Sequence, residues 1–184
     1  MKVTNCDIPG LLIIEPRIFG DDRGVFYETF NLNKFREITG IEDVSFFQDN
    51  ESISKINVLR GLHFQSPPFA QGKLVRVSFG RALDVAVDIR NGSPTYGKHF
   101  SIELSKENKK MFWIPPGFAH GFVALEYNTV FDYKCTNYYS PDCEGTIQWN
   151  DTCLNINWNV KNPIISEKDQ KGQDFTTFVS DFQF

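Results

Sequence analysis

Histidine is scarce in this chain of 184 residues, and the scarcity limits the metal sites that the chain can build. Its three histidines are His63, His99 and His120. They lie 36 and 21 residues apart, with no H-x-H and no H-x-x-x-H pair. A zinc or iron site would have to collect them from distant segments. We therefore expect no bound metal.

The sequence also lacks paired cysteines, long apolar runs and an excess of basic residues. No C-x-x-C motif occurs, and we expect reduced thiols in a cytoplasmic protein at Cys6, Cys135, Cys143 and Cys153. The apolar run at residues 11–14 is far shorter than the ~18 residues that span a bilayer. Acidic residues outnumber basic ones by 23 to 19, for a net charge of −4, so we expect neither a membrane nor a nucleic acid as partner.

Aromatic residues are abundant instead: 18 Phe, 6 Tyr and 3 Trp make up 15% of the chain. Rings at that density suit strands better than helices. Pro-Gly, Asn-Gly and Pro-Pro-Gly turn signals recur, and the segments between them are short and rich in Val, Ile, Phe and Tyr. This pattern is typical of an all-β sandwich or barrel. No linker or repeat interrupts it, so we expect one domain over residues 1–184.

Helix signals are few. The best covers residues 31–39, where Leu32, Phe35 and Ile38 share one face and Gly40 ends the pattern. We expect one short helix there.

The clearest strand covers residues 82–90, where side chains alternate with strict period two. A Gly-Arg pair joins it to residues 73–79, and we interpret that pair as a two-residue hairpin turn. In this register Lys73, Asp84 and Asp88 share one face with small residues. Two interpretations stay open: a solvated face with routine ion pairs, or the inner wall of a barrel that holds a polar ligand.

Four segments are specific enough to carry a resemblance. They are R-G-V-F-Y-E-T-F from Arg23, V-L-R-G-L-H-F-Q from Val58, Q-G-K-L-V-R-V from Gln71 and I-P-P-G-F-A-H-G-F from Ile114. Together they resemble the dTDP-4-dehydrorhamnose 3,5-epimerases, over nearly the whole chain. The resemblance implies an all-β, cupin-type jelly roll with a few short helices, working as a homodimer with arms exchanged between subunits. It also implies cofactor-free epimerisation at C3 and C5 of dTDP-4-dehydro-6-deoxy-D-glucose, a nucleotide-linked 4-keto-6-deoxyhexose.

The residue types suit that chemistry. Inverting a carbon beside a ketone needs a base, a positive charge or donor that holds the enolate, and an acid on the opposite face. His63 fits the base and Lys73 the enolate stabiliser. Tyr133 fits the acid, because a phenol is protonated at neutral pH. The resemblance places the carboxylate that orients His63 at Asp169, which spacing alone does not pair with it.

The nucleotide half of the substrate needs other groups. A diphosphate is best held by bidentate arginines, and a thymine by aromatic faces and amides. The resemblance implies substrate contacts at Arg23, Glu28, Gln48, Asn50, Arg60, His120, Glu144 and Lys168. We interpret His120 as a substrate or enolate contact and not as a metal ligand.

Two details of strand parity follow. Arg60 and His63 have opposite parity, so we expect either a bulge at Gly61 or a strand end between them. Asp132 stands where the family more often has an apolar residue. We expect its side chain to point away from that of Tyr133.

Two other functions stay open on the sequence. One is a sibling enzyme on the same scaffold: a 3- or 5-mono-epimerase, or a 3,4-ketoisomerase, although the closely spaced histidines typical of such ketoisomerases are absent. The other is a non-enzymatic sugar binder. A binder would need Arg23, Arg60 and aromatic side chains around the ligand, but it would not need His63, Lys73 and Tyr133 together.

Overall fold

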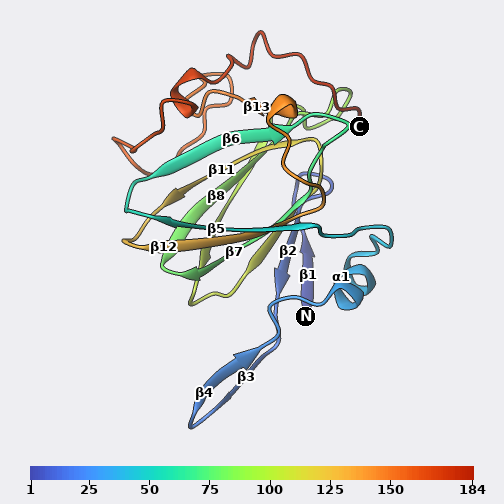
Figure 1. Ribbon diagram of the computed structural model, residues 1–184, viewed down its shortest axis with the longest axis vertical. Coiled ribbons are helices and arrows are strands. Elements are labelled where there is room, and N and C mark those ends of the chain that lie inside the picture. Colours follow the sequence, from blue (N-terminus) through green and yellow to red (C-terminus); the bar gives the residue numbers. More distant parts are fainter.

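Two antiparallel sheets face each other in the computed structural model of the chain, which describes residues 1–184 (Figure 1). The strands are β1 (Lys2–Asn5), β2 (Leu12–Glu15), β3 (Ile18–Asp21), β4 (Gly24–Tyr27), β5 (Gln48–Ser54), β6 (Leu59–Gln65), β7 (Lys73–Phe79), β8 (Arg81–Asp88), β9 (His99–Ser105), β10 (Met111–Ile114), β11 (Phe118–Ala124), β12 (Thr129–Cys135) and β13 (Glu144–Thr146). The helices are α1 (Leu32–Thr39) and the short 3-10 turns η1 (Pro141–Cys143) and η2 (Asp169–Lys171).

The strand order is that of a jelly roll. One sheet has six strands in the order β1-β2-β10-β7-β12-β5, and the other has five in the order β13-β6-β11-β8-β9. Strands adjacent in sequence repeatedly belong to different sheets, as β6 and β7 do, and β10 and β11. This confirms the expected all-β jelly roll of the cupin type.

Three apolar clusters hold the layers together. The first fills the space between the sheets and includes Phe112 and Phe131, both fully buried. The second lies on the outer face of the five-stranded sheet, where residues 148–184 cover it (orange to red in Figure 1). The third lies beneath α1, on the outer face of the six-stranded sheet. Each fully buried Phe contributes roughly 1.5–3 kcal/mol relative to exposure.

Helix α1 forms where its capping residues predict it. The side chain of Asn31 accepts a hydrogen bond from the Lys34 amide, and Gly40 ends the helix in the left-handed conformation at φ 72°. Phe35 anchors the helix on the sheet with 3% of its surface exposed. At eight residues α1 is the longest helix, and no helix of this structure is long and apolar enough to cross a membrane.

The predicted hairpin between β7 and β8 is wrong. Strand β7 pairs with β10 and β12, whereas β8 pairs with β9 and β11 in the opposite sheet. Gly80 carries the chain from one sheet to the other at φ 74°. The predicted faces are nevertheless correct, because Val75 and Val77 meet Ala82 and Ala86 in the cluster between the sheets. Period-two alternation specifies the face that a side chain takes but not the partner of its strand.

The β3–β4 hairpin extends away from both sheets, at the bottom of Figure 1. Four of its apolar side chains are exposed: Ile18, Phe19, Val25 and Phe26. Phe26 has 73% of its surface exposed. Arg17 lies over the Phe19 ring at 4.9 Å, but the chain leaves all four side chains exposed.

Candidate active site

A cavity of about 460 Å³ opens between the two sheets and collects most of the predicted site residues. The ten that line it are Gln48, Asn50, Arg60, His63, Lys73, His120, Tyr133, Glu144, Lys168 and Asp169. Both sheets contribute: β5, β7 and β12 form one wall, while β6, β11 and β13 form the other. Of the two interpretations of the face that carries Lys73, the inner wall of a barrel that holds a polar ligand is therefore the one that fits the structure.

His63 and Asp169 form a close pair. Nε2 of His63 lies 2.7 Å from Oδ1 of Asp169, although 106 positions separate the two residues. The carboxylate is buried and also accepts the Gly61 amide at 3.2 Å through Oδ2. Burial alone would raise the pKa of Asp169, but these bonds and the electrostatic interaction with His63 hold that pKa below its ordinary value. Because a carboxylate only accepts, Nε2 carries the proton and Nδ1 is free to act as a base.

The sheet register explains how Arg60 and His63 reach the same cavity. His120 of β11 pairs with His63 of β6, but Phe122 pairs with Arg60, so the register shifts by one residue between them. The extra residue of this bulge falls at Gly61, which has φ 140°. A Cβ on Gly61 would lie 2.5 Å from the Cα of Gly121. Of the two explanations for the parity conflict, the bulge at Gly61 is confirmed.

Lys73 and Tyr133 stand on the wall opposite His63. They come from the paired strands β7 and β12 and are both half-buried. Burial lowers the pKa of the Lys73 ammonium, while Cys135, Asp84 and Glu144 favour its charged form. Burial raises the pKa of the Tyr133 phenol, so this hydroxyl is a proton donor at neutral pH.

His120 lies beside His63 on the five-stranded sheet and is bound to a buried carboxylate. Its Nε2 lies 2.9 Å from Oδ2 of Asp84, which is fully buried on β8. Burial lowers the pKa of His120, and Asp84 works against that shift. The neutral ring donates its Nε2–H to Asp84 and keeps Nδ1 as a hydrogen-bond acceptor.

The rim of the cavity carries a polar network. Glu144 forms an ion pair with Lys168 and accepts the Tyr139 hydroxyl at 2.8 Å. Burial would raise the pKa of Glu144, but these partners hold it below its ordinary value. Gln48 donates to Asn50 at 3.0 Å and accepts the Tyr139 amide at 2.9 Å. These amides, charges and phenol are suited to binding the polar groups of a nucleotide.

Two predicted contacts lie outside the cavity of this chain. Arg23 stands at the tip of the β3–β4 arm, where it forms an ion pair with Asp21 at 2.5 Å. Glu28 follows the arm and pairs with Lys34 at 2.9 Å. Both sit on the segment that leaves the sheets, so within one chain they cannot reach His63.

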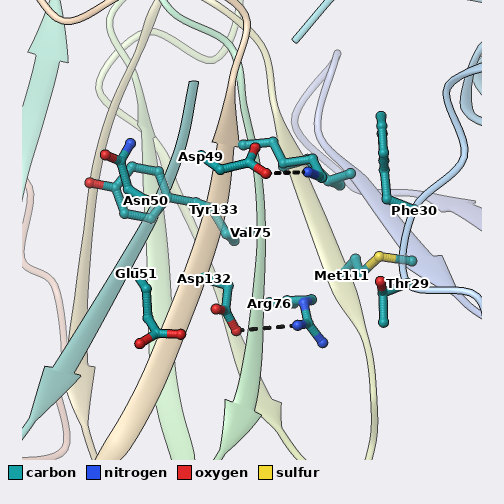
Figure 2. Close-up of a pocket in the computed structure, with 12 residues that line it drawn as sticks. Thr29, Phe30, Asp49, Asn50, Glu51, Val75, Arg76, Met111, Asp132 and Tyr133 are labelled. Atoms are coloured by element: carbon teal, nitrogen blue, oxygen red, sulfur yellow. Dashed lines mark hydrogen bonds and ion pairs between the residues drawn. The ribbon is translucent and has the colours of Figure 1, made fainter. Parts of the chain in front are cut away.

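A second hollow of about 320 Å³ lies on the outer face of the six-stranded sheet (Figure 2). Asp132 points toward Arg76 there, at 3.5 Å. The side chain of Tyr133 instead lies with that of Asn50. Asp132 therefore takes the face opposite Tyr133, as parity predicts.

Several lining residues were not assigned from the sequence: Ser52, Phe122, Phe131, Tyr139 and Ser166. Phe122 and Phe131 stack with centroids 3.9 Å apart and form an apolar surface in the cavity. Strand parity could have indicated both rings, because Phe122 is two residues from His120 and Phe131 is two residues from Tyr133. Cys135 lies next to Lys73 in the paired strands. His99, which has no assigned role, is half-buried on β9, and burial lowers its pKa.

No three or more His, Cys, Asp or Glu side chains gather as a metal ion would need. All four cysteines are free thiols. What the cavity does bring together is an imidazole–carboxylate pair on one wall and an ammonium and a phenol on the other. A jelly roll with that site is suited to proton transfer at a carbon beside a carbonyl group.

Comparison with known proteins agrees with a jelly-roll enzyme that transfers protons at a carbon beside a carbonyl group. The family model described as dTDP-4-dehydrorhamnose 3,5-epimerase matches residues 5–177. The protein of that name from Shigella flexneri is 53% identical over 175 residues, covering 95% of this chain and 96% of the relative. Its counterpart from Salmonella typhimurium is 54% identical over 170 residues, covering 92% of each chain. The chain belongs to the dTDP-4-dehydrorhamnose 3,5-epimerase family.

Solved structures support the same assignment. A dTDP-6-deoxy-D-glucose-3,5-epimerase from Legionella pneumophila, solved in complex with dTDP-4-keto-L-rhamnose, superposes with a TM-score of 0.95. It is 46% identical, and the match covers 100% of this chain and 98% of that one.

Proposed function

We propose that this chain converts dTDP-4-dehydro-6-deoxy-D-glucose to dTDP-4-dehydro-L-rhamnose by inverting C3 and C5, with His63 as base and Tyr133 as acid. Lys73 stabilises the enolate between the two proton transfers, and no metal or cofactor takes part. The alternative, a mono-epimerase, is not favoured, because the relatives at 53% and 54% identity carry the double-epimerase name.

One observation carries the proposal: the base and the acid come from facing sheets. His63 belongs to β6 of the five-stranded sheet, whereas Tyr133 and Lys73 belong to the six-stranded sheet. A flat 4-keto sugar held between the walls has one face toward the imidazole and the other toward the phenol. Removal of a proton from one face and return to the other inverts the carbon.

The proposed cycle uses each group once for each carbon. Nδ1 of His63 takes the proton beside the ketone, and Asp169 stabilises the imidazolium that forms. The electron pair of the C–H bond moves into the enolate, whose oxygen Lys73 stabilises with its positive charge. The Tyr133 hydroxyl then protonates the opposite face. The proton on His63 leaves to solvent and Tyr133 takes one up, which resets the site.

The remaining residues are proposed to hold the nucleotide. Arg60 and Lys168 supply positive charge to the diphosphate from one chain, and Gln48, Asn50 and Glu144 supply hydrogen bonds to the sugar or base. His120 accepts a hydrogen bond from a substrate hydroxyl through Nδ1. A neutral imidazole that donates its Nε2–H to Asp84 has no proton left to donate to the enolate. Of the two roles expected for His120, we therefore favour the substrate contact over the enolate contact.

The chain is further proposed to be a homodimer in the cytoplasm. The support is the β3–β4 arm, which exposes four apolar side chains and holds Arg23 beyond the reach of its own cavity. An arm inserted beside a partner's cavity would bury those side chains and deliver Arg23 to the diphosphate. Four free thiols accord with a reducing compartment.

Incubation with dTDP-4-keto-6-deoxy-D-glucose in D₂O, followed by NMR, tests the function. Deuterium should enter at both C3 and C5. Exchange at a single carbon would indicate a mono-epimerase, and exchange at neither would indicate a binder.

Two variants test the assigned roles in the same assay. His63→Ala should stop exchange at both carbons. Tyr133→Phe should keep exchange at C3 at least, while inverted product falls by ~10²–10⁴-fold, the usual contribution of a general acid. Tyr127→Phe is a matched control, because Tyr127 is 70% exposed and lies outside the cavity. Equal loss of exchange in the His63 and Tyr133 variants would contradict the division of roles.

A further inference from the structure

Strand β8 carries a buried charge that the proposed proton transfers do not use. Asp84 has none of its surface exposed and stands in the interior between Ala82 and Ala86, two members of the apolar cluster between the sheets. Its Oδ2 lies 2.9 Å from Nε2 of His120, but its Oδ1 has no hydrogen-bond partner. A buried carboxylate with an unpartnered oxygen costs folding free energy.

The next inward carboxylate on the same strand shows how a structural Asp is held. Asp88 is also fully buried, but its Oδ1 accepts from the backbone and side chain of Arg90, and its Oδ2 from Arg90, Ser93 and Thr95. Asp88 thus has both oxygens satisfied and an ion-pair partner at 2.7 Å. Asp84 has neither, so a structural role does not account for it.

Lys73 lines the cavity, and Asp84 is one of the charges that favour its protonated form. It begins β7 on the same inward face as Val75, opposite the sheet that holds Asp84, and it forms none of the ion pairs of this structure. Glu144, an acid on the opposite wall of the cavity that also favours the charged form of Lys73, is already bound to Lys168 and Tyr139. The uncommitted negative charge available to the Lys73 ammonium is therefore that of Asp84.

We propose that Asp84 is a positioning residue: His120 anchors its carboxylate, and its charge keeps the Lys73 ammonium protonated and in place to stabilise the enolate. The inference rests on the proposed function, because it acts through the role given there to Lys73. It explains why an unfavourable buried charge persists beside the site.

The test is Asp84→Asn, in which the amide oxygen still accepts from His120 while the charge is lost. Deuterium exchange at C3 and C5 should slow by about tenfold to a hundredfold, less than the loss of a direct enolate donor. KM should change little, since Asp84 touches no substrate. The midpoint of thermal unfolding should stay the same or rise, because an unpaired buried charge is removed.

Asp88→Asn is the matched control. It removes a buried carboxylate from the same strand and should lower the unfolding temperature while leaving the exchange rate of the folded protein unchanged. A second measurement places Asp84→Asn in a Lys73→Met background, where its effect should shrink to less than about threefold because the group it acts through is gone.

The outcomes separate cleanly. The proposal is overturned if Asp84→Asn exchanges deuterium as fast as an active wild-type protein. It is also overturned if Asp84→Asn slows exchange by the same factor with Lys73→Met as without it. It is equally overturned if activity falls only in proportion to unfolded protein. If wild-type protein exchanges at neither carbon, the proposed function itself fails.

Discussion

Removing the charge of Asp169, while keeping the shape of its side chain, should cripple the base. In the native site Oδ1 accepts from Nε2 of His63 at 2.7 Å and Oδ2 accepts from the Gly61 amide at 3.2 Å. Asn offers one oxygen and one NH₂ group. If the oxygen keeps the Gly61 bond, the NH₂ group donates to Nε2 of His63 and moves the ring proton to Nδ1, which can then no longer accept one.

The size of the effect follows from the bond that is lost. Hydrogen bonds to charged groups contribute ~1.5–3 kcal/mol. If that stabilisation of the imidazolium is lost in the transition state, the rate falls by ~10- to ~150-fold. The tautomer change adds to this loss, so these figures are a lower bound.

The assay is deuterium exchange and product formation at saturating substrate for Asp169→Asn, with Glu167→Gln as control. Glu167 is an exposed acid from the same segment. The control should retain full activity, and both variants should be folded by circular dichroism. A kcat for Asp169→Asn within threefold of wild type would refute the role given to the His63–Asp169 pair.

Three further predictions can be checked with simple measurements. The pKa values of Asp88, Glu144 and Asp169 are held below their ordinary values, so these three carboxylates stabilise the fold fully above about pH 4.5. That stabilisation is lost as the pH falls through their folded-state pKa values. The urea midpoint of unfolding should therefore be lower at pH 3 than at pH 6, and Asp169→Asn should make the difference smaller. Gly61→Ala should destabilise the fold by about 2 kcal/mol or more in urea unfolding, because its Cβ would meet Gly121 at 2.5 Å in a backbone with φ 140°. Activity should survive exhaustive chelation, since His63, Lys73 and Tyr133 cover the proton transfers; loss of activity that iron or zinc restores would contradict this.

Local features were predictable because their signals are local. The caps Asn31 and Gly40 bound α1 as the pattern indicates, and β7 covers residues 73–79 as predicted. Strand pairing was not predictable in the same way. The Gly80 junction looks like a hairpin turn, but the ladders of β7 and β8 are filled by strands distant in sequence.

In the site, too, the features with a local signal were predictable, and those that only the fold brings together were not. Alternation, combined with a turn at Gly80-Arg81, put Lys73 and Asp84 on one face, although it could not decide whether that face met solvent or a cavity. Spacing could never have paired His63 with Asp169, since only the folded η2 turn brings the carboxylate to 2.7 Å. The parity conflict at Arg60 pointed to a bulge in the correct place, because a one-residue slip is what returns both side chains to one face.

Mixed dimers test whether the β3–β4 arm serves the partner's cavity. Arg23→Ala should lower catalytic efficiency by about tenfold or more if it removes a charged contact with the diphosphate. His63→Ala abolishes activity in its own cavity. In a mixed dimer of the two variants, the Arg23→Ala chain keeps His63 and receives an intact Arg23 from its partner. Random mixing in equal amounts should therefore give about a quarter of all sites intact.

The matched control combines His63→Ala with Lys73→Met, two residues that line the cavity of the same chain. Every site in those mixed dimers lacks one of the two, so no activity should return. Recovery with Arg23→Ala but not with Lys73→Met is the pattern that requires an exchanged arm. If the Arg23→Ala mixture regains nothing beyond the residual rate of its parents, although mixed dimers are shown to form, then Arg23 either serves its own chain or contacts no substrate. In that case the exposed apolar arm needs another explanation.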